Sequence, residues 1–214
     1  MTIIGMSDFL DGAGRDAACW LCQKPVSIRA LFCAHCQTIQ PVRDLDPFTR
    51  LGLDRQFDLD TDLLENRYEA LVQELDSARF LVRGTGERGH IARQRDAVQQ
   101  AYELLRDPLA RGRCWLALNR KETPPAKGMV SPPFGHDLRR ELAEAADAPQ
   151  CDRIAWRAGQ ALEQGLMRLM QALRAESWTQ AQERLAEIDE IQAVLEEARA
   201  RRPDFVAPHA VPVS

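Results

Sequence analysis

The chain has 214 residues, of which 45% are hydrophobic and 28% are charged, and its formal net charge at pH 7 is −4. It is long enough to bury a sizeable core in more than one domain. Its acidic balance gives no overall attraction to nucleic acid or to an anionic membrane, and no apolar run approaches the roughly 20 residues that a membrane-spanning helix needs. We therefore expect neither nucleic acid nor a membrane as a partner.

Residues 1–18 are expected to form an N-terminal tail. Asp8, Asp11 and Asp16 make it acidic, whereas a transit peptide is rich in arginine and poor in acids. The apolar pair at residues 3–4 is too short for the hydrophobic region of a signal peptide. These features predict a cytoplasmic protein.

Four cysteines come next, in two Cys-x-x-Cys pairs with ten residues between them: Cys19, Cys22, Cys33 and Cys36. Each pair supplies two thiolates from one tight turn, which is the spacing typical of a tetrahedral zinc site. Four sulfur ligands leave no open position, so the site is expected to be structural. Iron is the minor alternative as the ligated metal, and two disulfides or four unligated thiols are the non-metal alternatives. We assign residues 19–44 to a zinc-binding arm.

Residues 45–119 are expected to form a helical hairpin domain. Asp46-Pro47-Phe48 predicts the start of a short helix, and Asp60 is placed to cap the next one. That second helix carries one apolar stripe, formed by Leu64, Tyr68, Leu71 and Leu75. A loop over residues 83–89 is predicted from its glycines. The third helix then carries Ile91, Val98, Tyr102 and Leu105 on one face and ends near Asp107-Pro108. A fourth segment covers residues 109–118.

The C-terminal part is expected to be a separate three-helix bundle. Residues 120–134 contain two proline pairs and form the predicted linker. Residues 135–200 carry three leucine- and isoleucine-rich stripes at helical spacing, which bury one another in a bundle. Residues 201–214, with three prolines, form the predicted disordered tail.

An enzymatic function finds little support in the residue pattern. Gly84, Gly86 and Gly89 follow a predicted helix rather than a strand, so they do not form a phosphate-binding loop of the usual kind. The four histidines are scattered, and no nucleophile–base set stands out. We expect the protein not to be an enzyme.

Several short motifs occur in an order that resembles one known family. They are Arg67-Tyr68, Arg79-Phe80, Gln100-Ala101-Tyr102, Asp107-Pro108-Leu109-Ala110-Arg111, Trp115-Leu116 and Glu176-Ser177-Trp178. With the cysteine arm, they resemble HscB, the J-type co-chaperone of iron–sulfur cluster assembly, in its zinc-arm version. The resemblance implies an all-α fold with a four-cysteine zinc arm, a J-domain-like helical hairpin at 45–119 and a C-terminal three-helix bundle at 135–200.

The resemblance also implies two partners, a DnaK-type chaperone and a cluster scaffold protein. J-domains stimulate the chaperone's ATPase through a His-Pro-Asp tripeptide. Here the aligned residues are Asp76, Ser77 and Ala78, which keep none of the tripeptide's chemical groups. We therefore expect ATPase stimulation to be weak or absent. Basic residues at this end of the hairpin, Arg79, Arg83 and Arg88, are candidates for weak docking on the chaperone, although a solvated charged loop is an equal interpretation.

Scaffold binding in the family uses the first bundle helix and a basic–aromatic pair on the last one. The candidates on the first helix are Asp137, Leu138, Glu141 and Leu142, and the two leucines could equally be bundle core. The basic–aromatic pair aligns with Asp189-Glu190, which reverses its charge and weakens the prediction. Two functions remain: a co-chaperone of iron–sulfur biogenesis with altered chaperone stimulation, or a zinc-containing adaptor that binds another protein.

Overall fold

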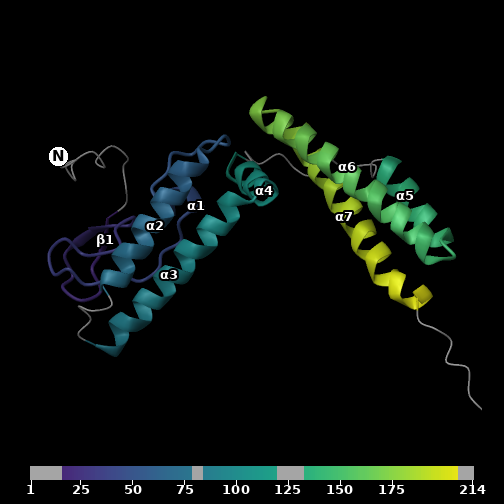
Figure 1. Cartoon of the computed structure of the whole chain (residues 1–214). Coiled ribbons are helices and arrows are strands. Elements are labelled where there is room, and N and C mark those ends of the chain that lie inside the picture. The colour runs from purple at the N-terminus through teal and green to yellow at the C-terminus, as the bar shows by residue number, and fades with distance from the viewer. Residues whose placement is uncertain (1–15, 79–83, 120–132, 207–214) are drawn as a thin grey trace, which may run out of the picture. The chain divides into compact units, whose positions relative to one another are not determined.

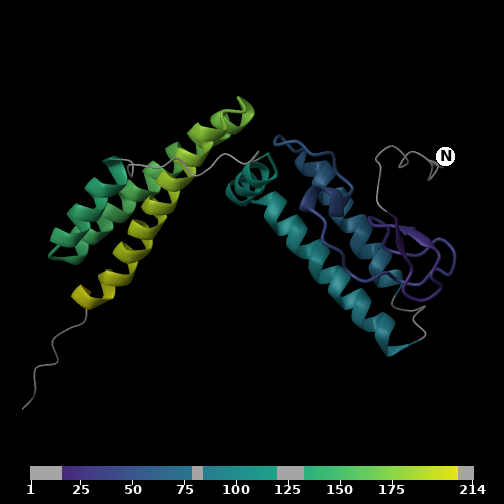
Figure 2. The same cartoon turned by 180° about the vertical axis from the view of Figure 1, so that it is seen from behind.

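The computed structural model describes residues 16–78, 84–119 and 133–206, and within these ranges its elements are seven helices and one two-stranded sheet (Figures 1 and 2). The chain divides into two compact units, Met1–Asp107 and Pro108–Ser214. In the described ranges, no helix combines the length and the apolar character that crossing a bilayer requires. The predicted helical fold class is confirmed.

The first unit begins with the cysteine arm. Strands β1 (Asp16–Ala18) and β2 (Pro25–Ser27) pair antiparallel, with Ala17 opposite Val26. Val26 is buried against two of the cysteines. The helix-based prediction did not include this small sheet, since a three-residue strand has too few positions to show an alternating pattern.

Three helices follow the arm: α1 (Pro47–Leu51), α2 (Thr61–Ala78) and α3 (Thr85–Arg106). Helices α1 and α2 begin near the predicted positions, because Asp46 caps α1 and the Asp60 carboxylate accepts hydrogen bonds from the first turn of α2. Helices α2 and α3 pack together, and α1 packs on both. Their core includes Phe48, Leu51, Leu64, Leu75, Ile91, Val98 and Leu105.

The loop predicted over residues 83–89 is wrong over most of its length, because α3 already begins at Thr85. Glycine weakens a helix interior, but Gly86 lies in the first turn, where backbone N–H groups have no helical partner in any case. Gly84 is the extended residue that precedes the helix. Glu87 in this first turn suits the positive end of the helix, and it also accepts a hydrogen bond from the arm. The contact between the arm and Glu87 thus favours a helix where the glycines alone predicted a loop.

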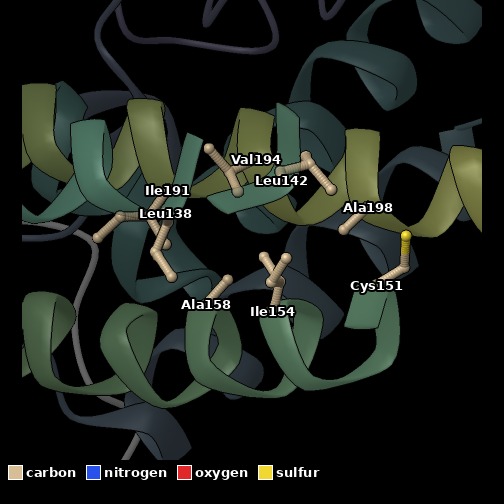
Figure 3. Close-up of a cluster of buried hydrophobic side chains, with 8 residues drawn as sticks. All are labelled: Leu138, Leu142, Cys151, Ile154, Ala158, Ile191, Val194 and Ala198. Atoms are coloured by element: carbon tan, nitrogen blue, oxygen red, sulfur yellow. The ribbon is translucent and has the colours of Figure 1, made fainter. Parts of the chain in front are cut away.

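The second unit contains α4 (Pro108–Asn119), α5 (Pro133–Glu144), α6 (Ala148–Arg174) and α7 (Trp178–Val206). Helices α6 and α7 form a long antiparallel pair, and α5 packs on both (Figure 1). Figure 3 shows the cluster at the centre of this packing, which joins Leu138 and Leu142 of α5 to side chains of α6 and α7. The predicted three-helix bundle is thus present.

Boundaries in this unit differ from the predicted ones. Helix α5 begins at Pro133, within the predicted linker, because proline suits the first position of a helix. Helix α7 continues to Val206, past the predicted start of a disordered tail at Arg201. Helix α4 packs on α6 and α7 and falls in the second unit, whereas the predicted division placed it with the hairpin. Residues 120–132 and 207–214 lie outside the described residues.

Candidate metal centre and partner surfaces

The sulfur atoms of Cys19, Cys22, Cys33 and Cys36 all lie within 4.8 Å of one another. The Sγ–Sγ distance is 3.7 Å both for Cys19 with Cys36 and for Cys22 with Cys33, so neither pair is a disulfide. Four sulfurs at about 2.3 Å from a central zinc would stand about 3.8 Å apart, as the edges of a tetrahedron. The cluster therefore has the size and the donor set of a four-thiolate metal site.

Both cysteine pairs sit on turns of the same geometry. The backbone N–H of Gln23 donates to the Cys19 carbonyl at 3.0 Å, and that of Gln37 donates to the Cys33 carbonyl at 2.8 Å. Both glutamines have positive φ angles, 60° and 58°. In each turn, the residue directly after the second cysteine has a left-handed backbone conformation. In both turns this residue is a glutamine, so the repeated Cys-Gln pair marks the turn in the sequence.

Electrostatics at the cluster favour a bound cation. Burial raises the pKa of the Cys19 thiol, but hydrogen bonds from the backbone of Cys22 and Leu21 and from Gln40 outweigh it and lower the pKa to about 6. The backbone N–H of Thr38 favours the Cys36 thiolate, but burial and the neighbouring thiols outweigh it and raise the pKa of Cys36 to about 12. Four thiolates so close together need a positive ion at their centre to ionise together.

Gln40 links the cysteine cluster to helix α3. Its fully buried amide donates to the Cys19 sulfur at 3.4 Å and to the Thr38 carbonyl at 3.1 Å. Gln94 of α3, also buried, donates to the Gln40 backbone carbonyl at 3.0 Å. The sequence did not reveal these glutamines, because a single buried polar residue, whether it lies before a helix as Gln40 does or within one as Gln94 does, produces no periodic pattern.

Two further contacts hold the arm on α3. The Thr38 hydroxyl donates to Glu87 Oε1 at 2.6 Å. The Trp20 indole donates to the Ile39 carbonyl at 2.7 Å, and its ring lies 5.3 Å from that of His90, centroid to centroid. The arm is therefore anchored on the hairpin domain through the first three turns of α3.

The aligned tripeptide position lies inside helix α2, not in a loop. Asp76 forms an ion pair with Arg95 of α3, and the Ser77 hydroxyl donates back to the Gln73 carbonyl at 2.8 Å. Ala78 is the last residue of α2. A proline at position 77 would clash with the preceding turn, so the absence of proline allows α2 to extend to Ala78. A cavity of about 750 Å³ between the arm and the hairpin is bordered by Ser77 and Ala78.

The predicted basic docking residues are only partly described. Arg79 and Arg83 lie outside the described residues, and Arg88 is exposed on the first turns of α3. Burial lowers the pKa of nearby His90, and the charge of Arg93 lowers it further, so this histidine adds little positive charge at neutral pH.

The predicted scaffold-binding residues separate into two groups. Leu138 and Leu142 are buried, at 0% and 1% exposure, which agrees with their interpretation as bundle core. Asp137 is exposed and pairs with Arg140, while Glu141 pairs with Arg157 of α6. Only the two acids can reach a partner from this structure without a rearrangement of the core.

The two acids at the position of the family's basic–aromatic pair form ion pairs within the bundle. Asp189 pairs with Arg113 of α4, and Glu190 lies 3.9 Å from Arg139 Nε and 4.0 Å from His136 Nδ1. A Cβ on Gly135 would stand 2.6 Å from the Glu190 carboxyl group, so the absence of a side chain there admits Glu190. These acids join α7 to α4 and to α5.

Comparison with known proteins finds no matching family model. The chain is 26% identical over 169 residues to an Arabidopsis thaliana protein described as an iron–sulfur cluster co-chaperone protein HscB homolog, covering 77% of this chain and 66% of that protein. It is 23% identical over 152 residues to a co-chaperone protein HscB homolog of Vibrio atlanticus, covering 67% of this chain and 89% of that protein. The crystal structure of the human co-chaperone HscB matches with a TM-score of 0.68 at 23% identity, covering 86% of this chain and 98% of the human one. The chain therefore has the HscB fold and resembles HscB co-chaperones in sequence.

Proposed function

We propose that this chain, similar in sequence and fold to HscB-type co-chaperones, acts in iron–sulfur cluster biogenesis by linking a DnaK-type chaperone to a cluster scaffold protein or another client. The observation that carries the proposal is the presence in one chain of both halves of that fold, the hairpin formed by α2 and α3 and the bundle formed by α5 to α7. The proposed role is non-enzymatic, and the proposed compartment is the cytoplasm.

The metal in the arm is proposed to be a structural zinc ion held by Cys19, Cys22, Cys33 and Cys36. Zinc bound by four thiolates has no open position, so it would supply folding free energy rather than chemistry. Elemental analysis of purified protein should give one zinc per chain. One iron per chain in place of zinc would overturn this assignment.

Stimulation of the chaperone's ATPase is proposed to be weak or absent. The support is the chemistry of Asp76-Ser77-Ala78: a carboxylate stands in place of an imidazole, and the third position has no carboxylate. In addition, the first of these side chains, Asp76, is already paired with Arg95 of α3. Weak docking through Arg88 and its neighbours remains part of this proposal.

The test is single-turnover ATP hydrolysis by the DnaK-type chaperone of the same source, measured with and without the cluster scaffold. The wild-type chain should leave the rate nearly unchanged. The triple variant D76H/S77P/A78D should raise it, because it restores the tripeptide, and the proline at position 77 should shorten only the C-terminal end of α2. Strong stimulation by the wild-type chain would refute the loss of stimulation while leaving the co-chaperone proposal intact.

The second candidate is a zinc-containing adaptor for a different protein. It is favoured by the ion pairs of Asp189 and Glu190, which leave acids where the family's route to the scaffold uses a basic and an aromatic residue. Affinity capture with purified scaffold protein separates the two candidates. Retention of the scaffold supports the co-chaperone, and failure of retention with an intact chain supports the adaptor.

A further inference from the structure

A stripe of exposed side chains runs along α6, largely away from the buried face of that helix. Its members, at spacings of three and four residues, are Arg153, Trp156, Gln160, Gln164, Arg168 and Gln171. Trp156 is 68% exposed, and Met167 beside the stripe is 59% exposed. Tryptophan and methionine are enriched where a protein surface meets a protein partner.

The stripe borders two hollows between α6 and α7. The first has a volume of about 430 Å³ and is lined by Trp156 and Arg168 of α6 and Glu187 of α7, among others. The second has a volume of about 310 Å³ and is lined by Arg168 again and by Arg184 of α7. Because Arg168 lines both, we describe them together as the Trp156–Arg184 groove. Its residues lie within the second unit.

The groove has a positive charge at its centre. Its one lining carboxylate in the described residues, Glu187, is buried and pairs with Arg184 at 2.7 Å. Arg157 is paired with Glu141 of α5. Arg168, by contrast, makes no ion pair or hydrogen bond to any part of the chain that the structure describes. A carboxylate from outside the chain is the complementary group for this guanidinium.

We infer that the Trp156–Arg184 groove binds an acidic amphipathic helix of a protein partner, with an apolar side chain on Trp156 and a carboxylate on Arg168. The two anchors are twelve residues apart, or about 18 Å along α6, which corresponds to about three turns of the bound helix. Concave hollows fit side chains rather than a flat lipid surface. One tryptophan provides too little stacking area for a single-stranded nucleic acid. This inference does not depend on the proposed co-chaperone role.

The test uses the full-length, metal-loaded protein and a fluorescein-labelled helical peptide of 22 residues. The peptide carries a leucine and a glutamate three turns apart on one face and further glutamates beside them, and a second peptide has glutamine at every glutamate. Fluorescence anisotropy should show binding of the glutamate peptide, weakening with added salt, and at least tenfold weaker binding of the glutamine peptide. Equal affinity for the two peptides, or no binding of the glutamate peptide, would overturn the inference.

Variants locate the binding on the groove. Arg168→Glu and Trp156→Ala should each weaken the peptide affinity at least tenfold. Arg199→Glu is the matched control, since Arg199 is an exposed arginine of α7 that lines neither hollow, and it should change the affinity less than twofold. Circular dichroism should show the same helical content in all three variants, because each altered side chain is exposed. An equal loss with Arg199→Glu would attribute the binding to net charge and overturn the inference.

Two other ligands are tested in parallel, vesicles of phosphatidylglycerol and phosphatidylcholine and a single-stranded oligothymidylate. If either ligand binds, its affinity should be the same for the wild-type protein and for the Trp156→Ala and Arg168→Glu variants. If its affinity fell in these variants while the glutamate peptide failed to bind, the groove would be a lipid or nucleic-acid site and the inference would be wrong.

Discussion

At the scale of single residues, Asp46 joins the end of the arm to the hairpin. Its carboxylate caps α1 through the Thr49 backbone N–H at 3.1 Å and pairs with Arg55 at 2.6 Å. Burial raises its pKa, but the hydrogen bonds from Arg55 and Thr49 outweigh that and hold the pKa below its ordinary value. The carboxylate form is therefore the stabilising one.

Replacing Asp46 by alanine should lower the free energy of unfolding at pH 7 by about 1 kcal/mol, through the lost cap. The folded-state pKa is lowered, so the contribution of the charge is complete above the unfolded-state value of about 3.9 and is lost as pH falls through the folded-state value. Urea unfolding at several pH values should thus show the wild-type advantage shrinking below about pH 4. Asp46→Asn keeps a capping acceptor, so it should lower the free energy of unfolding at pH 7 by less than Asp46→Ala does. An equal decrease in the two variants would show that the ion pair with Arg55, and not the cap, is responsible.

Gly135 should tolerate no side chain without a cost to the bundle. A Cβ there would meet the Glu190 carboxyl group at 2.6 Å, and Glu190 would have to leave Arg139 and His136. Because alanine raises the helix propensity at Gly135 as well as at Gly159, we expect Gly135→Ala to leave the second unit about 1 kcal/mol less stable than Gly159→Ala does in thermal unfolding. Gly159→Ala is the control, since nothing lies near its Cβ position, and it should be neutral or stabilising. Equal effects of the two changes would contradict the close approach of Glu190.

The residue scale also shows how far sequence reasoning extends. The four candidate metal ligands follow from the spacing of the two Cys-x-x-Cys pairs, and the helix caps at Asp46 and Asp60 follow from partners within a few residues. Gln40 and Gln94 could not be found in this way, since their roles depend on a contact between segments 54 residues apart. The burial of Leu138 and Leu142 likewise depends on which face of α5 meets α6 and α7.

At the scale of elements, hydrogen bonds join the cysteine arm to helix α3. The Gln94–Gln40–Cys19 chain of hydrogen bonds runs from α3 to a candidate metal ligand, and Glu87 accepts a hydrogen bond from Thr38. The early turns of α3 contain Gly86 and Gly89, so their intrinsic helix stability is low. The arm therefore supplies part of the stability of these turns.

Removal of the metal should loosen the first turns of α3 as well as the arm. Chelation with excess EDTA, or Cys33→Ser, should speed hydrogen exchange at residues 86–94 by tenfold or more and leave residues 98–105 unchanged, because the latter pack in the hairpin core. Cys151→Ala is the matched control: this cysteine is buried in the bundle and should keep the metal and the exchange pattern of α3. Unchanged exchange at residues 86–94 in the metal-free protein would show that the arm does not support α3.

The helices of the hairpin and of the bundle could be predicted from the sequence. Their apolar stripes repeat over many turns, as in α6 and α7, so the periodic signal is strong. The start of α3 was not predictable, because its stabilising contacts come from the arm. The small sheet of the arm was not predicted either, because it has only three residue pairs and is too short to show an alternating pattern.

At the scale of the whole molecule, two cores are formed by two separate stretches of chain. Unit 1 contains the arm and α1 to α3, and unit 2 contains α4 to α7. A fragment of residues 108–214 should fold alone, with a helical circular dichroism spectrum and a cooperative thermal transition. Chelators should lower the thermal midpoint of a fragment of residues 16–107 and leave the 108–214 fragment unaffected. A metal-dependent transition in the latter would contradict the division into units.

The division between the two units falls at the Asp107–Pro108 bond, whereas residues 120–132 connect two helices of the same unit. Helix α4 is therefore attached covalently to α3 but bound by Arg113 to Asp189 of α7. A chain cut between Asn119 and Pro133 would have its break within unit 2, and α4 on the first piece would still have its docking site on the second. The two pieces should therefore reassociate when they are mixed, as in fragment complementation, because α4 of the first piece can pack again on α6 and α7 of the second.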